Sequence, residues 1–185
     1  NLPRERRAGG ATRTEAGEHS RTEQARRTPH RQLLGYRGNM TDLQAAIGRA
    51  QLPKYPEQLA RRAALAERYH RAFDGMPGLQ LPAQSDAMRH SAHHLYPVHL
   101  GGWTEASRDA LIDALREDGV PTNVHFIPLP RLTVHRARGV EPAAFPVAER
   151  YFAGAISLPL HTLLTDEQQD WVIDRFVHHV NRLGA

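Results

Sequence analysis

Apolar residues recur every three or four positions in several parts of the sequence, which is the spacing of one face of an α-helix. In the first such part, Leu43 and Ile47 lie on a common face. Thr41 and Gln44 have the spacing of a capping box, in which each side chain bonds the other residue's backbone N–H. This part of the chain therefore predicts a helix that begins after Thr41.

Two prolines, Pro53 and Pro56, interrupt the helical pattern. A proline inside a helix removes a hydrogen bond and clashes with the preceding turn, so a break or kink is predicted there. A second helix should follow and end at Asp74-Gly75, because glycine commonly terminates helices. Its apolar face is formed by Leu59, Ala63, Ala66, Tyr69 and Phe73.

Residues 94–100 and 120–127 are rich in apolar and β-branched residues and predict two strands. Pro97 lacks a backbone N–H donor. It therefore indicates either that the first strand lies at a sheet edge or that Pro97 lies at a strand end. Residues 128–144 are rich in Pro, Arg and Gly and are expected to form a loop. Between the two strands, a helix that Thr104 can cap and Gly119 can end should bury Leu111, Ala114 and Leu115.

The C-terminal part predicts a helix that starts at Pro146, a short extended segment over 156–160, and a long final helix. Thr165 and Gln168 have capping-box spacing at its start. Its apolar face carries Val172, Ile173, Phe176, Val177, Val180 and Leu183. The order of these elements predicts a small mixed α/β fold, with helices packed against a short sheet.

The net charge of +4 resides in residues 1–31, which hold eight arginines and four glutamates. This segment has almost no large apolar residue and cannot offset the entropy lost on ordering, so it is expected to be a disordered basic tail before a domain over 32–185. A nucleic-acid-binding arm is the functional alternative. Against it, the arginines alternate with glutamates, and no aromatic side chain offers a stacking platform for bases.

The sequence has no cysteine and a single lysine, Lys54. These counts exclude disulfides and cysteine nucleophiles, and any Schiff base in this chain would have to form on Lys54. No metal site is expected, because adjacent histidines point apart on a strand or a helix; the clustered ones are His90, His93, His94, His99, His178 and His179. Without a membrane-length apolar stretch or a signal-peptide core, a cytoplasmic protein is expected.

One block of the sequence runs from Leu34 through Gly35-Tyr36-Arg37-Gly38-Asn39 to Leu52. Further blocks lie at residues 60–69, 92–98, 119–129, 145–160 and 165–170. In order and spacing, these blocks resemble the DegT–StrS family of pyridoxal-phosphate-dependent sugar aminotransferases. Together they cover about 33–183, whereas 130–138 and the tail depart from the family's pattern.

The resemblance implies the small C-terminal domain of a fold-type-I aminotransferase, with helices packed on a short mixed, mainly antiparallel sheet. In this family a larger N-terminal domain carries the lysine that forms the internal aldimine with pyridoxal 5′-phosphate (PLP). Lys54 does not match that lysine. The resemblance therefore implies that this chain is not catalytic alone, because transamination needs a lysine amine to hold the cofactor and to move the proton.

The family's reaction moves an amino group from an amino acid, usually glutamate, to a keto group on a nucleotide-linked sugar in amino-sugar biosynthesis. The resemblance implies that the complete enzyme binds PLP, a nucleotide sugar and an amino-acid donor, and forms a homodimer. The alternatives are a non-catalytic remnant or interaction module, and a basic nucleic-acid-binding protein. An in-frame large domain upstream would favour the enzyme.

Four residues match functional segments of the family. Arg37 and Asn39 match a segment that reaches across a dimer interface towards the partner's cofactor phosphate, although they could merely order the turn before the helix. His125 and Phe126 match a segment beside the substrate, and a strand histidine bonded within the core is the alternative. Because the large domain would pack on the helix after Thr41, its exposed apolar residues predict self-association.

Overall fold

The computed structural model describes residues 40–83, 85, 86 and 88–184. The expected tail, 1–31, lies outside these residues. The chain divides after Ala45 into two units. In the first unit, the Gln44 N–H donates to Thr41 Oγ1 at 3.3 Å and the Thr41 N–H donates to Gln44 Oε1 at 2.9 Å. This reciprocal pair confirms the predicted capping box at the start of helix α2 (Asp42–Gln51).

In the second unit, the two prolines break the helical path as predicted. A single 3₁₀ turn, η1 (Leu52–Lys54), separates α2 from α3 (Tyr55–Phe73). Pro53 and Pro56 each lie in the first turn of their helix, where a missing N–H costs no hydrogen bond. Helix α3 ends at the predicted place, and Gly75 adopts a φ of 72°, a conformation that glycine tolerates best.

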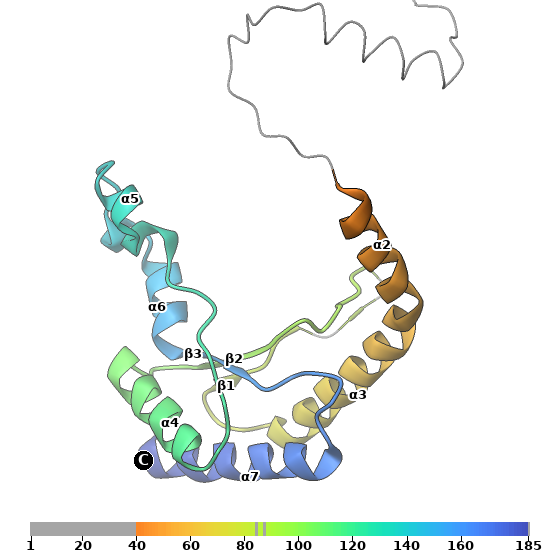
Figure 1. Ribbon diagram of the computed structural model, residues 1–185. Helices are drawn as coiled ribbons and strands as arrows, with labels where there is room; N and C mark the ends of the chain where they lie inside the picture. Colours follow the sequence, from red (N-terminus) through yellow and green to blue (C-terminus); the bar gives the residue numbers. More distant parts are fainter. Residues whose placement is uncertain (1–39, 84, 87, 185) are drawn as a thin grey trace, which may run out of the picture. The chain divides into compact units, whose positions relative to one another are not determined.

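A three-stranded antiparallel sheet forms the centre of the second unit, with β2 (Tyr96–Leu100) between β1 (Leu79–Gln80) and β3 (Ala155–Leu158) (Figure 1). The strands expected at 94–100 and 156–160 are thus present, with slightly different bounds. Pro97 pairs with Ser157 of β3, whereas β1 reaches only the last two residues of β2. Pro97 therefore lies towards the strand end, as expected.

The two faces of the sheet have different surroundings, because successive side chains of a strand point to opposite sides. Tyr96 and Val98 of β2 and Ile156 of β3 face the hydrophobic core. Helices α3, α4 (Glu105–Glu117) and α7 (Asp166–Leu183) close that core, and α4 lies beside α7 (Figure 1). The buried residues that they contribute are Ala66, Tyr69, Phe73, Leu111, Leu115, Val172, Phe176 and Val180. His99 and Ser157 belong to the other face.

Polar caps start both of the long C-terminal helices. Thr104 accepts from the Ser107 N–H at the start of α4, and Thr165 accepts from the Gln168 N–H at the start of α7. The predicted inward residues of α4, Leu111, Ala114 and Leu115, are buried. These features confirm the expected mixed α/β fold. Among the described residues, no helix is both long and apolar enough to cross a membrane.

Two expectations for the middle of the chain are wrong. Residues 120–127 do not form a strand: only Asn123 pairs with Ser157, in one isolated antiparallel bridge. Pro121 cannot donate to a ladder, and the Val124 N–H donates to Asn123 Oδ1 at 2.7 Å instead of to a neighbouring strand. Residues 128–144 are not simply a loop. They contain three short helical turns: η2 (Leu129–Arg131), α5 (Thr133–Arg136) and η3 (Pro142–Ala144).

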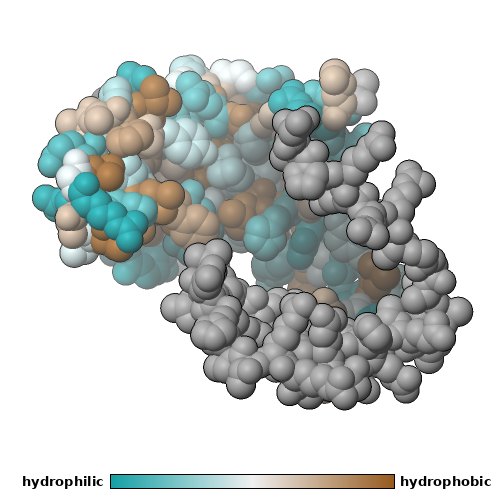
Figure 2. All heavy atoms as spheres, turned by 90° about the horizontal axis from the view of Figure 1, so that it is seen from above, coloured by the Kyte–Doolittle hydropathy of each residue, from teal (hydrophilic) through white to brown (hydrophobic). Residues whose placement is uncertain are grey.

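Helix α6 (Pro146–Gly154) follows and begins at the predicted proline. Around α5 and α6 many large apolar side chains are exposed rather than buried. On the face seen in Figure 2, brown and tan apolar groups lie among hydrophilic ones on the left, where α5 lies in Figure 1. The exposed set is Phe126, Ile127, Leu129, Leu132, Val134, Phe145, Val147 and Tyr151. This part of the chain thus offers apolar surface to a partner.

Candidate functional site

His125 lies against the sheet face that is turned away from the core. Its Nδ1 is 2.9 Å from the hydroxyl oxygen of Ser157, which is itself buried in β3. Its Nε2 has only a long contact, 3.5 Å from Asn123 Nδ2. The serine hydroxyl can donate or accept, so the contact suits either neutral form of the imidazole. Ser157 therefore holds one edge of the ring, although the sequence predicted only an extended segment over 156–160 and no role for this serine.

Phe126 projects from the same segment. Its side chain is 76% exposed, and its ring meets the His125 ring edge to face with centroids 4.8 Å apart. An exposed phenyl ring beside a tethered imidazole can contact a ligand by stacking and by hydrogen bonding. The structure thus brings His125, Phe126 and Ser157 together. The other two predicted site residues, Arg37 and Asn39, lie outside the described residues.

The described residues do not fit the covalent requirement of PLP. The sequence has one lysine, Lys54, and the structure places it exposed at the end of η1. An aldimine needs an amine held beside the cofactor in a water-excluded site. The described residues therefore supply no amine suited to hold PLP covalently.

The histidines show no metal centre in the part of the chain that the structure describes, where no group of three potential ligands comes together. His99 is buried on the outer face of the sheet, and its ring stacks on Tyr151 with centroids 5.2 Å apart. His179 Nε2 lies 2.7 Å from Asp118 Oδ2, which ties α7 to the end of α4. These contacts give both histidines a structural role.

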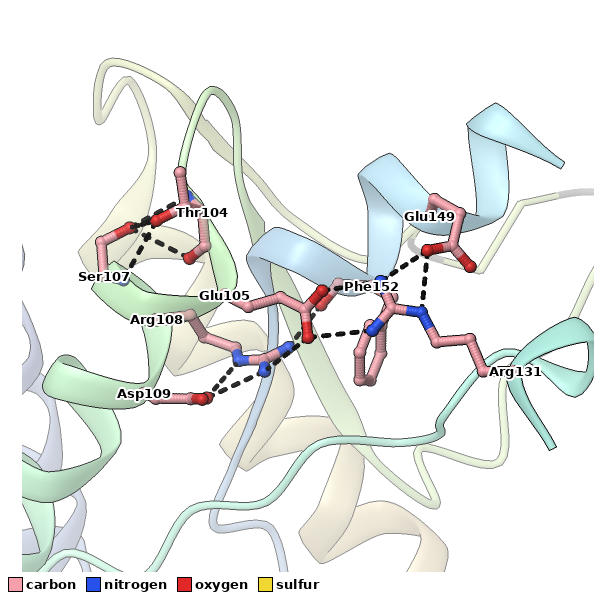
Figure 3. A network of polar contacts seen from close by, with 8 residues as sticks. All are labelled: Thr104, Glu105, Ser107, Arg108, Asp109, Arg131, Glu149 and Phe152. Carbon is pink, nitrogen blue, oxygen red and sulfur yellow. Dashed lines mark hydrogen bonds and ion pairs between the residues drawn. The ribbon is translucent and has the colours of Figure 1, made fainter. Parts of the chain in front are cut away.

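Sequence reasoning missed a polar cluster that joins three elements (Figure 3). Arg131, in η2, donates to both carboxylate oxygens of Glu105 at 2.6 and 3.0 Å. The same guanidinium donates twice to Glu149 Oε2, at 2.5 and 2.8 Å. Glu105 begins α4 and Glu149 belongs to α6. The partners are 18 and 26 residues away along the chain, so no local pattern could have indicated them.

A second arginine and an aromatic ring complete this cluster. Arg108 is only 4% exposed and donates to the Phe152 carbonyl oxygen at 2.5 Å. The guanidinium carbons of Arg108 and Arg131 lie 4.8 and 4.7 Å from the centroid of the Phe152 ring. Asp109 also pairs with Arg108, at 2.8 Å. Buried Arg108 and partly buried Arg131 therefore each have a carboxylate and an aromatic face as neighbours, which offsets their desolvation.

Arg131 also favours the charged form of its main partner. Its hydrogen bond to Glu105 lowers the pKa of that carboxyl below its usual value, and burial opposes this shift only in part. The two carboxylates in turn raise the pKa of Arg131. Glu105 and Arg131 are therefore both charged near neutral pH.

Comparison with known proteins identifies the fold. The sequence pattern of the DegT/DnrJ/EryC1/StrS aminotransferase family matches residues 12–177 and so extends into the segment that we expected to lie outside it. The spore coat polysaccharide biosynthesis protein SpsC of Bacillus subtilis is 38% identical over 143 residues, which is 76% of this chain and 36% of SpsC. The dTDP-4-dehydro-2,3,6-trideoxy-D-glucose 4-aminotransferase of Saccharopolyspora spinosa is 31% identical over 80% of this chain and 38% of its own length.

Among solved structures, that of Spr1654 from Streptococcus pneumoniae, described as a sugar aminotransferase, is 35% identical with a TM-score of 0.74. The match covers 78% of the present chain and 36% of the Spr1654 chain. Structures of the PLP and PMP forms of Spr1654 are also solved. The present chain therefore spans little more than a third of the length of the relatives that it matches. It has the fold of the C-terminal part of a fold-type-I aminotransferase. The chain belongs to the DegT/DnrJ/EryC1/StrS aminotransferase family.

Proposed function

We propose that this chain is the C-terminal portion of a PLP-dependent aminotransferase that acts on nucleotide-linked keto sugars in amino-sugar biosynthesis. The observation that carries the proposal is the agreement in sequence and in fold, over most of this chain, with sugar aminotransferases. The substrate class rests on the Saccharopolyspora relative, whose name specifies a dTDP-linked dehydro sugar. The complete enzyme binds PLP, takes the amino group from an amino acid and works as a homodimer.

In this proposal the chain is not catalytic alone. Its single lysine is exposed on a 3₁₀ turn, so the aldimine lysine belongs to the family's N-terminal part. Arg37 and Asn39 contribute a cation and an amide donor to the cofactor phosphate. His125 and Phe126 contact the nucleotide sugar, His125 by a hydrogen bond and Phe126 by its exposed ring.

The isolated chain tests the first half of the proposal. We expect that mixing it with PLP gives no saturable aldimine absorbance and that borohydride fixes no stoichiometric pyridoxyl group. Lys54→Arg is the matched control, since it keeps the charge and removes the primary amine. A stoichiometric adduct that disappears in Lys54→Arg would show that this chain holds the cofactor itself. It would refute the proposal that the aldimine lysine belongs to the N-terminal part.

A joined protein tests the second half. The N-terminal part of Spr1654, for which PLP and PMP forms are known, can be fused to residues 32–185 of this chain. We expect glutamate to convert the bound PLP to PMP and a dTDP-linked keto sugar to restore PLP. A fusion that binds PLP but turns over no nucleotide sugar would favour the alternative of a non-catalytic interaction module.

A further inference from the structure

The segment that carries His125 and Phe126 is weakly held by its own backbone. Among the described residues of the segment 120–127, only Asn123 makes backbone hydrogen bonds to β3. Its N–H and its carbonyl oxygen both pair with Ser157. No backbone-to-backbone hydrogen bond joins residues 124–127 to any described part of the chain, and the Val124 N–H bonds only the neighbouring Asn123 side chain. Packing adds little after His125, since Phe126 is 76% and Ile127 56% exposed. Something other than a strand ladder must fix where this segment runs.

The next firm attachment along the chain is the side chain of Arg131. It engages Glu105 on α4 and Glu149 on α6, and its guanidinium lies over the Phe152 ring (Figure 3). Residues of two helices thus bind the side chain of one residue of η2. Pro128 precedes η2 and restricts the backbone between Phe126 and Arg131. The segment is consequently held at both ends, by the Asn123 bridge and by Arg131.

We infer that Arg131 is a positioning residue that fixes the His125–Leu129 segment, and with it Phe126, for contact with the nucleotide sugar. The functional half of this inference, contact with the nucleotide sugar, rests on the proposed function. Its structural half, that Arg131 fixes the segment, does not. Arginine suits the task because its planar fork can bond two carboxylates at once, whereas lysine offers a single point charge. Arg131 itself touches no reacting group in this scheme and acts through the segment.

Chymotrypsin cleavage after Phe126 measures the structural half in the 185-residue chain. Removing the charge-assisted bonds in Arg131→Met should raise the cleavage rate between about tenfold and a hundredfold. Arg131→Lys, which restores only one pairing, should lie between Arg131→Met and the unaltered chain. Arg175→Met is the matched control, because Arg175 also pairs with a carboxylate, that of Asp174, and lies over an aromatic ring, that of Trp171.

Low urea distinguishes local opening from general destabilisation. Cleavage through local opening depends weakly on urea below the unfolding transition, whereas cleavage through global unfolding rises steeply. We expect the weak dependence in Arg131→Met. Equal cleavage rates in Arg131→Met and Arg175→Met, or a steep urea dependence, would overturn the inference.

The fusion with the N-terminal part of Spr1654 measures the functional half. Arg131→Met should raise the KM for the nucleotide sugar by about tenfold or more, and it should leave the rate of the glutamate half-reaction unchanged. Parallel loss in both half-reactions, or an unchanged sugar KM, would refute a role in substrate positioning. If the unaltered fusion does not transaminate, the proposed function fails, and chymotrypsin cleavage alone decides whether Arg131 fixes the segment.

Discussion

The hydroxyl oxygen of Ser157 and the Nδ1 atom of His125 lie 2.9 Å apart, although the two residues are 32 positions apart in sequence. Ser157 is buried in β3, whereas His125 belongs to a segment without regular structure. The contact therefore transfers the fixed geometry of the sheet to an imidazole ring that would otherwise rotate. The Ser157 hydroxyl is the shorter of the two polar contacts that the His125 ring makes among the described residues.

Ser157→Ala should release this ring. We expect the free energy of unfolding to fall by about 1 kcal/mol, the usual worth of one such hydrogen bond. In the fusion enzyme, the KM for the nucleotide sugar should rise while the glutamate half-reaction is preserved. Urea unfolding and steady-state kinetics provide these measurements. Ser91→Ala, at an exposed serine, is the control, and an equal effect in both variants would contradict the prediction.

Gly154 ends α6 where the chain passes β2. A Cβ atom at this position would collide with the Leu100 carbonyl oxygen and lie 3.1 Å from His99 Nε2. Gly154→Ala should therefore destabilise the fold by about 1–3 kcal/mol, since backbone cannot move aside as a flexible side chain can. Gly48→Ala is the matched control. Gly48 lies within α2, and nothing lies near its Cβ position. Gly48→Ala should therefore raise the free energy of unfolding by about 0.5–1 kcal/mol. Thermal unfolding of the two variants should shift in opposite directions.

Two carboxyl groups predict how stability depends on pH. Hydrogen bonding to Arg61 lowers the pKa of Asp166, and hydrogen bonding to Arg131 lowers that of Glu105. A group whose pKa is lower in the folded state binds more protons when unfolded, so stability rises with pH across that interval. The contribution is complete above the unfolded values, about 3.9 for Asp and 4.3 for Glu. It is lost as the pH falls through the folded values.

The melting temperature should accordingly decrease below about pH 4. Asp166→Asn removes one of the carboxyl groups whose pKa is lowered and should weaken this dependence, and it should also lower the melting temperature at pH 7. Asp174→Asn is a suitable control, because its carboxylate pairs within α7 and not between elements. Identical pH profiles for the unaltered chain and Asp166→Asn would be evidence against this assignment.

Exposed apolar residues on α2 predict self-association of the isolated chain. Leu43 is 73% and Ile47 57% exposed, four positions apart on a helix with no buried residue. Replacing both with glutamine should reduce the apparent mass measured by light scattering. Met88→Gln tests specificity, because Met88 is 92% exposed but stands outside this helix. A monodisperse monomer of the unaltered chain would rule out the expected association.

Helices with polar caps were the most predictable elements of this fold. Thr41, Thr104 and Thr165 mark helix starts because a cap is a local contact, made within three residues. Strands were less predictable because a ladder needs a partner from elsewhere in the chain. The segment 120–127 has strand-like composition, yet two of its backbone donors are not available to a ladder. Pro121 has no N–H, and the Val124 N–H donates to the Asn123 side chain. Strand β1, with two residues, is too short for any periodic signal.

The candidate site divides in the same way. The position of His125 and Phe126 within one segment follows from the sequence, but the serine that holds His125 comes from β3. Likewise, nothing near Arg131 in the sequence indicates that Glu105 and Glu149 will meet it. Such contacts arise only when α4, α6 and η2 have packed, so they belong to the tertiary structure and leave no trace in local patterns.

Among the described residues, the hydrogen bonds that hold the His125 segment all lie within residues 105–157. This continuity bears on recombination between related genes. A crossover outside 105–157 transfers the guanidinium, both carboxylates, the Phe152 ring and the Ser157 hydroxyl together. A crossover inside this stretch can separate Arg131 from the carboxylates that hold it, and the hybrid then inherits a partly buried charge without its partners.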